Sequence, residues 1–445
     1  MDKNFFITTP IYYPSAKPHM GHAYSSIIAD FFARIKRIQG HNVFFLTGTD
    51  EHGQKIQRAA EKKGVDPKTF CDEISTNFRN LSKVLNLSND DFIRTTEARH
   101  AKSVKKIWTI LEDKKEIYLS KYSGWYSVSD EAFYSEDEIE DINSKKVSKI
   151  SGSPVEWIEE ESYFFRLSKW QEPLLKFYSE NKNFILPESR RNEVISFVKS
   201  GLKDLSVSRK SFSWGIKVPS NKNHVIYVWL DALTNYLSAL NYPDTNDQLY
   251  KNFWPASLHL IGKDILRFHA VYWPAFLLAA DILPPQRVYG HGWILSGEEK
   301  MSKSKGNILD PLEIINNYGL DPLRYYLIKE VSFGNDGNIS KEKLESCINS
   351  DLANNFGNLC QRVTAFTEKN LNSKVPDKYE FNKDDTKILN EYKSNFDNLL
   401  KYTNNQDLNN YVNFIQEQLF SANKYFNDQE PWKKKSDTKR LNSII

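Results

Sequence analysis

The chain has 445 residues, of which 40% are hydrophobic and 26% are charged, as in soluble globular proteins. This length favours two or three domains over one compact core. The net charge of +3, from 60 basic and 57 acidic residues, neither requires nor excludes a nucleic-acid partner. The sequence has no long uncharged apolar run and no signal-peptide pattern, which argues against a membrane or secreted protein.

The three cysteines, Cys71, Cys347 and Cys360, are far apart and form no CxxC pair. Their spacing supports neither a disulfide framework nor a zinc knuckle. We therefore expect a cytoplasmic protein that has no structural metal site and does not associate with membranes.

The N-terminal residues 4–46 predict a βαβ unit. Residues 4–8, NFFIT, have the apolar character of a buried strand, and apolar residues then recur from Met20 to Ile35 at helical spacing. Gly40 ends this helix, and residues 42–46, NVFFL, predict the next buried strand. Such a unit implies parallel strands with a right-handed crossover, and ligands bind at the carboxyl edge of such a sheet.

The texture of the sequence changes between residues 116 and 205, which are rich in aromatic and acidic residues. We interpret this stretch as an α+β insertion between two halves of a parallel-sheet domain, because strand-like and helix-like segments resume in residues 224–240 and 258–280. Beyond about residue 345 only helical periods remain. The predicted fold is therefore α/β, followed by an all-α helix bundle.

Two histidines, His19 and His22, lie where the first helix begins, with Gly21 between them. Backbone N–H groups and the helix dipole at a helix N-terminus favour an anion, and imidazole donors there can bind phosphate oxygens. The sequence contains neither GxGxxG nor the P-loop motif, so these histidines would replace the glycines of other nucleotide sites. On these residues alone, two surface or capping histidines are an equally good interpretation.

A second candidate phosphate site is the loop GEEKMSKSKGN, residues 297–307. Its lysines, Lys300, Lys303 and Lys305, could bind a polyphosphate as mobile point charges. A lysine-rich loop by itself is more often a solvated surface turn. Its occurrence together with the histidine pair favours nucleotide chemistry over that alternative.

The motifs HMGH and KMSKS resemble the two signatures of class I aminoacyl-tRNA synthetases. Six blocks in the same order, covering essentially the whole chain, are similar to the methionyl-tRNA synthetase family: TTPIYYPSAKPHMGHAY, LTGTDEHGQKIQ, YVWLDALTNY, LIGKDILRFHAVYWPAFL, GHGWILSGEEKMSKSKGN and NDQEPWKKK. The resemblance implies ATP-dependent ligation of L-methionine to methionine tRNA through a methionyl-adenylate, for translation initiation and elongation.

The resemblance further implies a Rossmann-like catalytic domain, split by the insertion and followed by an anticodon-binding domain. Many family members bind zinc in the insertion, but here it contains no cysteine, so we predict no zinc. The insertion is also small for an editing domain. The family's bundle usually continues beyond EPW, so we expect a truncated or naturally shortened helical domain. The assigned ranges are 1–115 (catalytic, first half), 116–205 (insertion), 206–290 (catalytic, second half), 291–345 (KMSKS loop and stem-contact region) and 346–445 (anticodon-binding helices).

The resemblance implies roles in the activation of ATP. His19 and His22 would stabilise the ATP phosphates, and Lys303 the departing pyrophosphate. Arg209 would meet the substrate carboxylate or the α-phosphate, although an isolated arginine is more often solvated. The implied catalytic residues are His19, His22, Arg209, Lys300 and Lys303, and the implied ATP-binding residues are His19, Gly21, His22, Lys303 and Ser304.

The resemblance also implies a methionine site lined by apolar and aromatic residues, which suit a polarizable thioether. Asp50 would bind the methionine ammonium group, although without the resemblance a carboxylate that caps the next helix is an equally good interpretation. Trp229 and Tyr236 could instead be plain core residues. The implied methionine-binding residues are Ile11, Tyr13, Asp50, Trp229, Ala232, Tyr236, Ile265 and His269.

In the helical domain the resemblance implies anticodon recognition by Asn358, Arg362, Pro431 and Trp432. Single-stranded RNA bases stack on aromatic rings and are bonded at their edges by Asn and Arg. The segments NNFGNLCQRV and NDQEPWKKK should therefore approach each other in an antiparallel bundle. The alternative for Trp432 is a core position that closes the bundle.

The implied cofactor is ATP with Mg²⁺, with no dedicated protein cage for the ion. The implied partners are L-methionine, ATP and methionine tRNA, and we expect a monomer. Two alternatives remain open: a class I synthetase for another apolar amino acid, and a catalytically inactive tRNA-binding paralogue. The second should have lost His19, His22 or Lys303, and all three are present.

Overall fold

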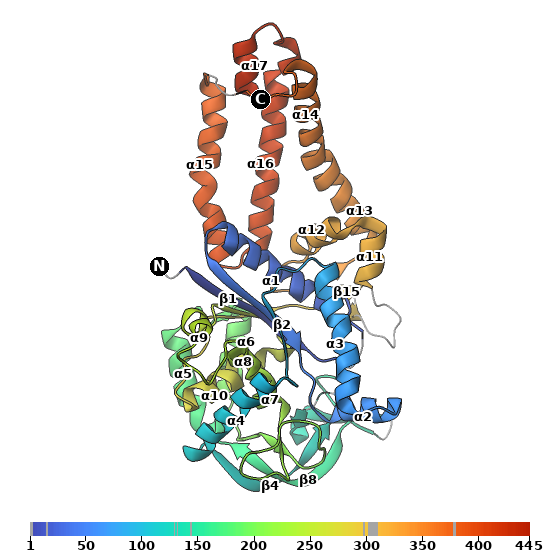
Figure 1. Ribbon diagram of the computed structural model, residues 1–445, viewed down its shortest axis with the longest axis vertical. Coiled ribbons are helices and arrows are strands. Elements are labelled where there is room, and N and C mark those ends of the chain that lie inside the picture. Colours follow the sequence, from blue (N-terminus) through green and yellow to red (C-terminus); the bar gives the residue numbers. More distant parts are fainter. Residues whose placement is uncertain are drawn as a thin grey trace. The chain divides into compact units, whose positions relative to one another are not determined.

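The computed structural model divides the chain into two units, Met1–His291 and Gly292–Ile445 (Figure 1). No helix in the described part of the chain combines the length and the apolar character that crossing a bilayer requires. The described residues are 3–14, 17–128, 130, 132–142, 145–296, 299–300, 310–376 and 380–445.

The N-terminal unit is built on a six-stranded sheet with the strand order β3-β2-β1-β13-β14-β9. Every neighbouring pair in this sheet is parallel. Its inner strand β2 is buried from Val43 to Thr49, as expected of a parallel strand with both faces covered. The strands span Asn4–Tyr12 (β1), Asn42–Thr49 (β2), Asp91–Arg94 (β3), Ile185–Leu186 (β9), Leu258–Gly262 (β13) and Val288–His291 (β14).

The first crossover confirms the predicted βαβ unit. Helix α1, Met20–Ile38, connects the parallel strands β1 and β2 and buries the apolar face that the sequence spacing predicted. Gly40 follows the helix with φ of +80°. Residues other than glycine rarely adopt this left-handed conformation, so the glycine suits the end of the helix. The loop that leads into α1 therefore lies at the carboxyl edge of the sheet.

One hydrophobic core joins the strands of the sheet to the helices of the N-terminal unit. Phe6 of β1, Trp108 of α4 and Trp273 of α10 are fully buried within it. This core packs the helices of the unit against the sheet. The helices of this unit include α2 (Gln54–Lys63), α3 (Pro67–Val84), α4 (Ala98–Asp113), α7 (Val228–Leu233), α8 (Asn235–Ser238), α9 (Gln248–Phe253) and α10 (Trp273–Ala279).

The region predicted as an insertion contains a separate antiparallel sheet of order β10-β8-β4-β5. The same region contributes β9, which pairs with β14, so part of it belongs to the six-stranded sheet. The domain ranges assigned from the sequence stay predictions. The elements of this region are β4 (Ile117–Ser127), β5 (Ala132–Tyr134), β6 (Ile139–Ile142), β7 (Lys145–Ser148), β8 (Glu156–Phe165), α5 (Gln171–Glu180), α6 (Glu188–Lys199) and β10 (Leu205–Ser206).

The C-terminal unit begins with a small sheet, β16-β15-β17, and continues as helices. In the described residues after Ile339 every element is helical, which confirms the predicted all-α region. The long helices α15 and α16 lie side by side, and the hydroxyl of Tyr392 donates to the carbonyl of Gln418 between them at 3.0 Å (Figure 1). The elements are β15 (Ile294–Ser296), β16 (Glu299–Lys300), α11 (Pro311–Tyr318), α12 (Leu320–Glu330), β17 (Gly337–Ile339), α13 (Lys341–Cys347), η6 (Ile348–Gly357), α14 (Asn358–Asn370), α15 (Lys383–Asn404), α16 (Leu408–Gln429), η7 (Pro431–Lys433) and α17 (Thr438–Ile444).

Candidate active site

The two histidines at the start of α1 cap the helix reciprocally. The backbone N–H of Gly21 donates to Nδ1 of His19 at 3.1 Å, and the backbone N–H of His19 donates to Nδ1 of His22 at 3.0 Å. Because each Nδ1 accepts a hydrogen bond, the proton of each neutral imidazole lies on Nε2. Both rings therefore keep an Nε2–H donor that the cap does not use.

The His22 ring is packed between its neighbours. Its centroid lies 3.8 Å from that of His19, 4.9 Å from that of Tyr12 and 5.3 Å from that of Phe78. Burial, with a smaller contribution from the His19 charge, holds the pKa of His22 well below its ordinary value. The ring therefore stays neutral in the free protein, which preserves Nδ1 as the acceptor of the cap.

Gly21 occupies a position at which a side chain would collide with His19. A Cβ atom there would lie 3.0 Å from Cε1 and 3.1 Å from Nδ1 of the His19 ring. The glycine therefore allows the imidazole to fold back onto the helix terminus. One turn further, Ser25 Oγ lies 2.8 Å from Nε2 of His291, which ties α1 to the end of β14. Sequence reasoning missed His291, although it lies in the block that contains KMSKS.

The loop after β2 carries Asp50, whose backbone N–H donates to the carbonyl of Tyr12 at 2.9 Å. Asp50 is 7% exposed. Its neighbour Glu51 is fully buried and accepts hydrogen bonds from Nε and Nη2 of Arg94 at 2.7 and 2.9 Å. The N-cap of the next helix, α2, is Gly53, which has no capping side chain. The loop is thus held by the Glu51 side chain and by the backbone bond from Asp50 to the end of β1.

The structure brings three predicted pocket residues, Ile11, Trp229 and Ala232, into one apolar cluster together with Tyr227. The Trp229 ring stacks on Phe268 with centroids 3.3 Å apart. Phe268 was not predicted, although it lies in the block LIGKDILRFHAVYWPAFL. These side chains together form a flat apolar surface of the kind that suits a thioether.

Three further predicted residues form a buried hydrogen-bonded chain. His269 Nδ1 lies 3.0 Å from the carbonyl of Ile265, so it donates, and Nε2 accepts from the Tyr236 hydroxyl at 2.8 Å. Burial lowers the pKa of His269 to about 4 and keeps the ring neutral. The Tyr236 ring stacks on His259 with centroids 4.1 Å apart. His259 was not predicted, and it also contacts Thr8 of β1 at 2.9 Å through Nδ1.

Tyr13 belongs to a different cluster from the other predicted pocket residues. It packs with Trp214 and the apolar side chains of α2 and α3. Its hydroxyl donates to the carbonyl of His52 at 3.2 Å, and Lys55 Nζ lies 5.2 Å from its ring centroid. Tyr13 therefore supports the loop that carries Asp50, and its assignment to the methionine pocket stays a prediction.

Arg209, on the short strand β11 (Ser208–Arg209), is 1% exposed, so the alternative of a solvated arginine is wrong. Its Nη1 donates to Ser206 Oγ at 2.6 Å and to the Ser208 carbonyl at 2.7 Å. The guanidinium lies 3.9 Å from the ring centroid of Tyr227, a member of the apolar cluster. Arg209 is thus positioned beside the candidate methionine pocket. Its contact with substrate stays a prediction.

Most of the second signature, including Lys303 and Ser304, lies outside the residues that the structure describes. Lys300 is on β16, where its backbone pairs with that of Leu295 of β15. The roles of Lys300, Lys303 and Ser304 therefore stay predictions.

In the C-terminal unit the two segments expected to meet are in contact. Arg362 Nη2 donates to Oδ1 of Asn427 at 2.7 Å, and its guanidinium lies 5.1 Å from the ring centroid of Phe426. Trp432 is 42% exposed and meets Phe426 edge to face at 6.4 Å. Pro431 is buried, and Asn358 begins α14. The Trp432 ring is thus partly exposed, and its part in anticodon binding stays a prediction.

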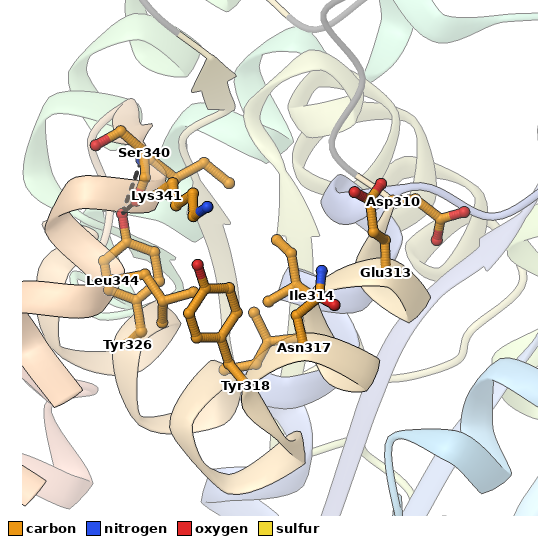
Figure 2. Close-up of a pocket in the computed structure, with 11 residues that line it drawn as sticks. Asp310, Glu313, Ile314, Asn317, Tyr318, Tyr326, Ser340, Lys341 and Leu344 are labelled. Carbon is orange, nitrogen blue, oxygen red and sulfur yellow. Dashed lines mark hydrogen bonds between the residues drawn. The ribbon is translucent and has the colours of Figure 1, made fainter.

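A separate pocket of about 150 Å³ lies in the C-terminal unit, among α11, α12, β17 and α13 (Figure 2). Figure 2 shows Tyr318, Tyr326 and Leu344 along one side and Asp310 with Glu313 at the far end. Among the described residues, none that the sequence predicted to be functional lines this pocket.

No group of three or more His, Cys, Asp or Glu side chains suited to a metal ion occurs in the described parts of the chain. The absence of structural zinc stays a prediction. The residues that the sequence missed include a buried triad, His52, Asp231 and His100, described below. Two of the three lie in the quoted blocks LTGTDEHGQKIQ and YVWLDALTNY, where attention to other ionisable side chains could have found them.

The comparison with known proteins agrees with this geometry. The family described as tRNA synthetases class I (M) matches residues 5–144 and 141–364. A methionine--tRNA ligase of Rickettsia bellii is 51% identical over 454 residues, covering 100% of this chain and 87% of the relative. One of Brucella suis is 49% identical, covering 100% and 86%. The structure of Mycobacterium tuberculosis methionyl-tRNA synthetase in complex with methionyl-adenylate matches with a TM-score of 0.97 and 46% identity, over 99% of this chain and 88% of that chain.

The parallel sheet and the family match over most of the chain define a class I aminoacyl-tRNA synthetase. Within this class the chain belongs to the methionyl-tRNA synthetase family.

Proposed function

We propose that the start of α1 and the neighbouring pocket activate methionine, the first step in making methionyl-tRNA. A carboxylate oxygen of methionine attacks the α-phosphorus of ATP, the bond to the β-phosphate breaks, and pyrophosphate leaves. The terminal adenosine hydroxyl of tRNA then attacks the carbonyl carbon of the adenylate, loses its proton and displaces AMP. The observation that carries this proposal is the reciprocal cap at the N-terminus of α1, in which both histidines accept through Nδ1 and so carry the ring proton on Nε2.

These donors suit a developing negative charge on the ATP phosphates. Backbone N–H groups and the helix dipole already favour an anion at this position, and preorganised donors stabilise charge that grows during the reaction. Gly21 leaves room for the His19 ring at the helix terminus, where a Cβ atom would collide with it. Lys300, Lys303 and Ser304 are proposed to bind the phosphates from the other signature.

Methionine is proposed to bind with its ammonium group at Asp50 and its thioether against the apolar cluster of Ile11, Trp229 and Ala232. Tyr236, Ile265 and His269 would form the far wall, with Tyr13 supporting the loop. The buried Asp50 carboxylate supports this orientation, because a buried carboxylate gains most from a cationic partner. Arg209 is proposed to bind the substrate carboxylate or the α-phosphate from the Tyr227 side.

We further propose that Mg²⁺ enters with ATP, since the described residues offer no group of three or more metal ligands. Methionine tRNA is the proposed macromolecular partner, with its anticodon bound at Asn358, Arg362, Pro431 and Trp432. We expect the enzyme to act as a monomer in the cytoplasm.

An ATP/pyrophosphate exchange assay with each of the twenty amino acids tests the activity. We expect exchange that depends on methionine. Exchange with another apolar amino acid would favour a different synthetase specificity. No exchange at all, from a folded protein, would favour an inactive tRNA-binding paralogue.

A further inference from the structure

We propose that Asp231 is a positioning residue that fixes the loop carrying Asp50 against the helix carrying Trp229 and Ala232. In this way it would set the distance between the ammonium anchor and the thioether pocket. The inference rests on the proposed function of that pocket. It assigns a role to a buried triad of ionisable side chains, His52, Asp231 and His100, that no step of the chemistry uses directly.

The triad is formed by residues far apart in the sequence. Asp231 lies on α7 and is fully buried. Its Oδ2 lies 2.6 Å from Nδ1 of His52, which is in the loop after β2. Its Oδ1 lies 2.7 Å from Nε2 of His100, on α4. One carboxylate therefore joins a loop and two helices of the N-terminal unit.

The hydrogen-bond pattern assigns a direction to each contact. The paired histidines, with His52 the larger influence, overcome the effect of burial and lower the pKa of Asp231 to about 2, so its oxygens only accept. The Ser238 hydroxyl donates to the carbonyl of Thr234 at 2.9 Å and so presents a lone pair to Nδ1 of His100 at 3.0 Å. His100 is thus bonded at both ring nitrogens, and the triad is a closely spaced joint of ionisable side chains.

On the loop side, the joint acts on the segment that carries Asp50. His52 follows Asp50 by two residues, and its ring meets Trp214 edge to face at 5.6 Å. The Trp214 indole N–H donates to the carbonyl of Glu51 at 2.6 Å. The backbone from Asp50 to His52 is therefore held by Trp214 on one side and by Asp231 on the other.

On the helix side, Asp231 lies between two residues of the apolar cluster. Trp229 precedes it by two positions and Ala232 follows it directly. Because α7 has only six residues, a contact in its middle constrains the whole helix. The carboxylate thus connects the Asp50 loop to the surface on which the thioether is proposed to rest.

The described contacts of Asp231 do not include His19, Gly21 or His22. Loosening the joint should therefore weaken methionine recognition and leave ATP recognition unchanged. A group that only stabilised the fold would affect both substrates alike, or neither.

The test compares Asp231→Asn with Asp30→Asn in ATP/pyrophosphate exchange. Asp30 is an equally buried carboxylate, on α1, and is bonded to Arg34 and Ser88. We expect Asp231→Asn to raise the KM for methionine about tenfold, the effect of losing one charged hydrogen bond, with the KM for ATP within about twofold of wild type. Asp30→Asn should lower the melting temperature without changing either KM.

If Asp231→Asn does not fold, a second pair of variants tests the positioning role of Asp231. His52→Asn keeps an N–H donor near the position of Nδ1, and His52→Ala removes it. We expect His52→Ala to weaken methionine binding about tenfold, measured by tryptophan fluorescence without ATP, and His52→Asn to restore most of it.

The proposal is overturned if Asp231→Asn folds and leaves the methionine KM unchanged, if both KM values rise together, or if the two His52 variants bind methionine equally. These results would leave the wild-type exchange activity intact. If the wild-type protein itself shows no exchange with methionine, the proposed function fails, and the positioning role fails with it.

Discussion

The backbone N–H of His19 donates to Nδ1 of His22 at 3.0 Å, so His22 caps the backbone of the residue that precedes the helix. The capping and the functional interpretations of this pair are therefore compatible. Nδ1 of each ring accepts a hydrogen bond within the cap, and the proposed phosphate contact would use Nε2. A histidine can do both because its two nitrogens point in different directions.

Gly21→Ala should separate helix stability from catalysis. The new Cβ would displace the His19 ring, because it would lie 3.0 Å from Cε1. Alanine also favours a helix over glycine by roughly 0.5–1 kcal/mol, so the melting temperature should not fall. We expect pyrophosphate exchange to slow about tenfold, as expected for a misplaced donor. Normal exchange would show that the His19 ring need not lie where the cap holds it.

Lys303→Ala should slow adenylate formation strongly while methionine binding stays near normal. Its charge is expected to matter when pyrophosphate departs, and loss of one such electrostatic contact costs about a hundredfold in rate. Single-turnover adenylate formation and a methionine titration measure the two effects separately. An unchanged rate would remove Lys303 from the mechanism.

Asp50→Asn should raise the KM for methionine by about ten- to hundredfold, the effect of losing a hydrogen bond between charged groups. ATP binding should be nearly unchanged. Asp66→Ala is the control, because it removes the side chain that caps α3 and should lower only stability. If Asp50→Asn behaves like Asp66→Ala, the carboxylate is structural and the ammonium site lies elsewhere.

Stability should fall between pH 7 and pH 5, in part through His269. Burial lowers its pKa to about 4 in the folded protein, whereas the unfolded value is about 6.5. The unfolded chain therefore binds more protons in this range, and acid favours unfolding by about 2 kcal/mol at pH 5 from this residue. Urea unfolding of wild type and His269→Gln at both pH values measures the difference. The variant, which keeps an acceptor for Tyr236, should lose about 2 kcal/mol less than wild type on acidification.

Trp432→Ala should reduce aminoacylation of methionine tRNA by about one to two decades, since base stacking on an aromatic ring contributes roughly 1–3 kcal/mol. Pyrophosphate exchange, which needs no tRNA, should be unaffected. Phe426→Ala is the control: this ring is 4% exposed, and its loss should cost about 3–5 kcal/mol of stability. If Trp432→Ala also lowers the melting temperature and the exchange rate, the ring is a core residue.

Features that depend on neighbouring residues could be predicted from the sequence alone. The strand, helix and strand of residues 4–46, and the histidines at the helix start, follow from local spacing. The helical character of the C-terminal unit follows from apolar periodicity. Periodicity and capping act within one or two turns, so the information lies in adjacent residues. The two-residue strand β9 could not be found in this way, because two residues are too few to show a period.

The tertiary structure alone decided which distant side chains meet. His52 and His100 lie 179 and 131 positions from Asp231, yet they share its carboxylate. It also decided that Arg209 is buried beside Tyr227, and that Tyr13 supports the Asp50 loop in a cluster with Trp214. Such contacts depend on the order of strands in the sheet and on how the helices pack against it. These contacts form only when the whole chain has folded. The two partners lie too far apart in the sequence for a local pattern to include both.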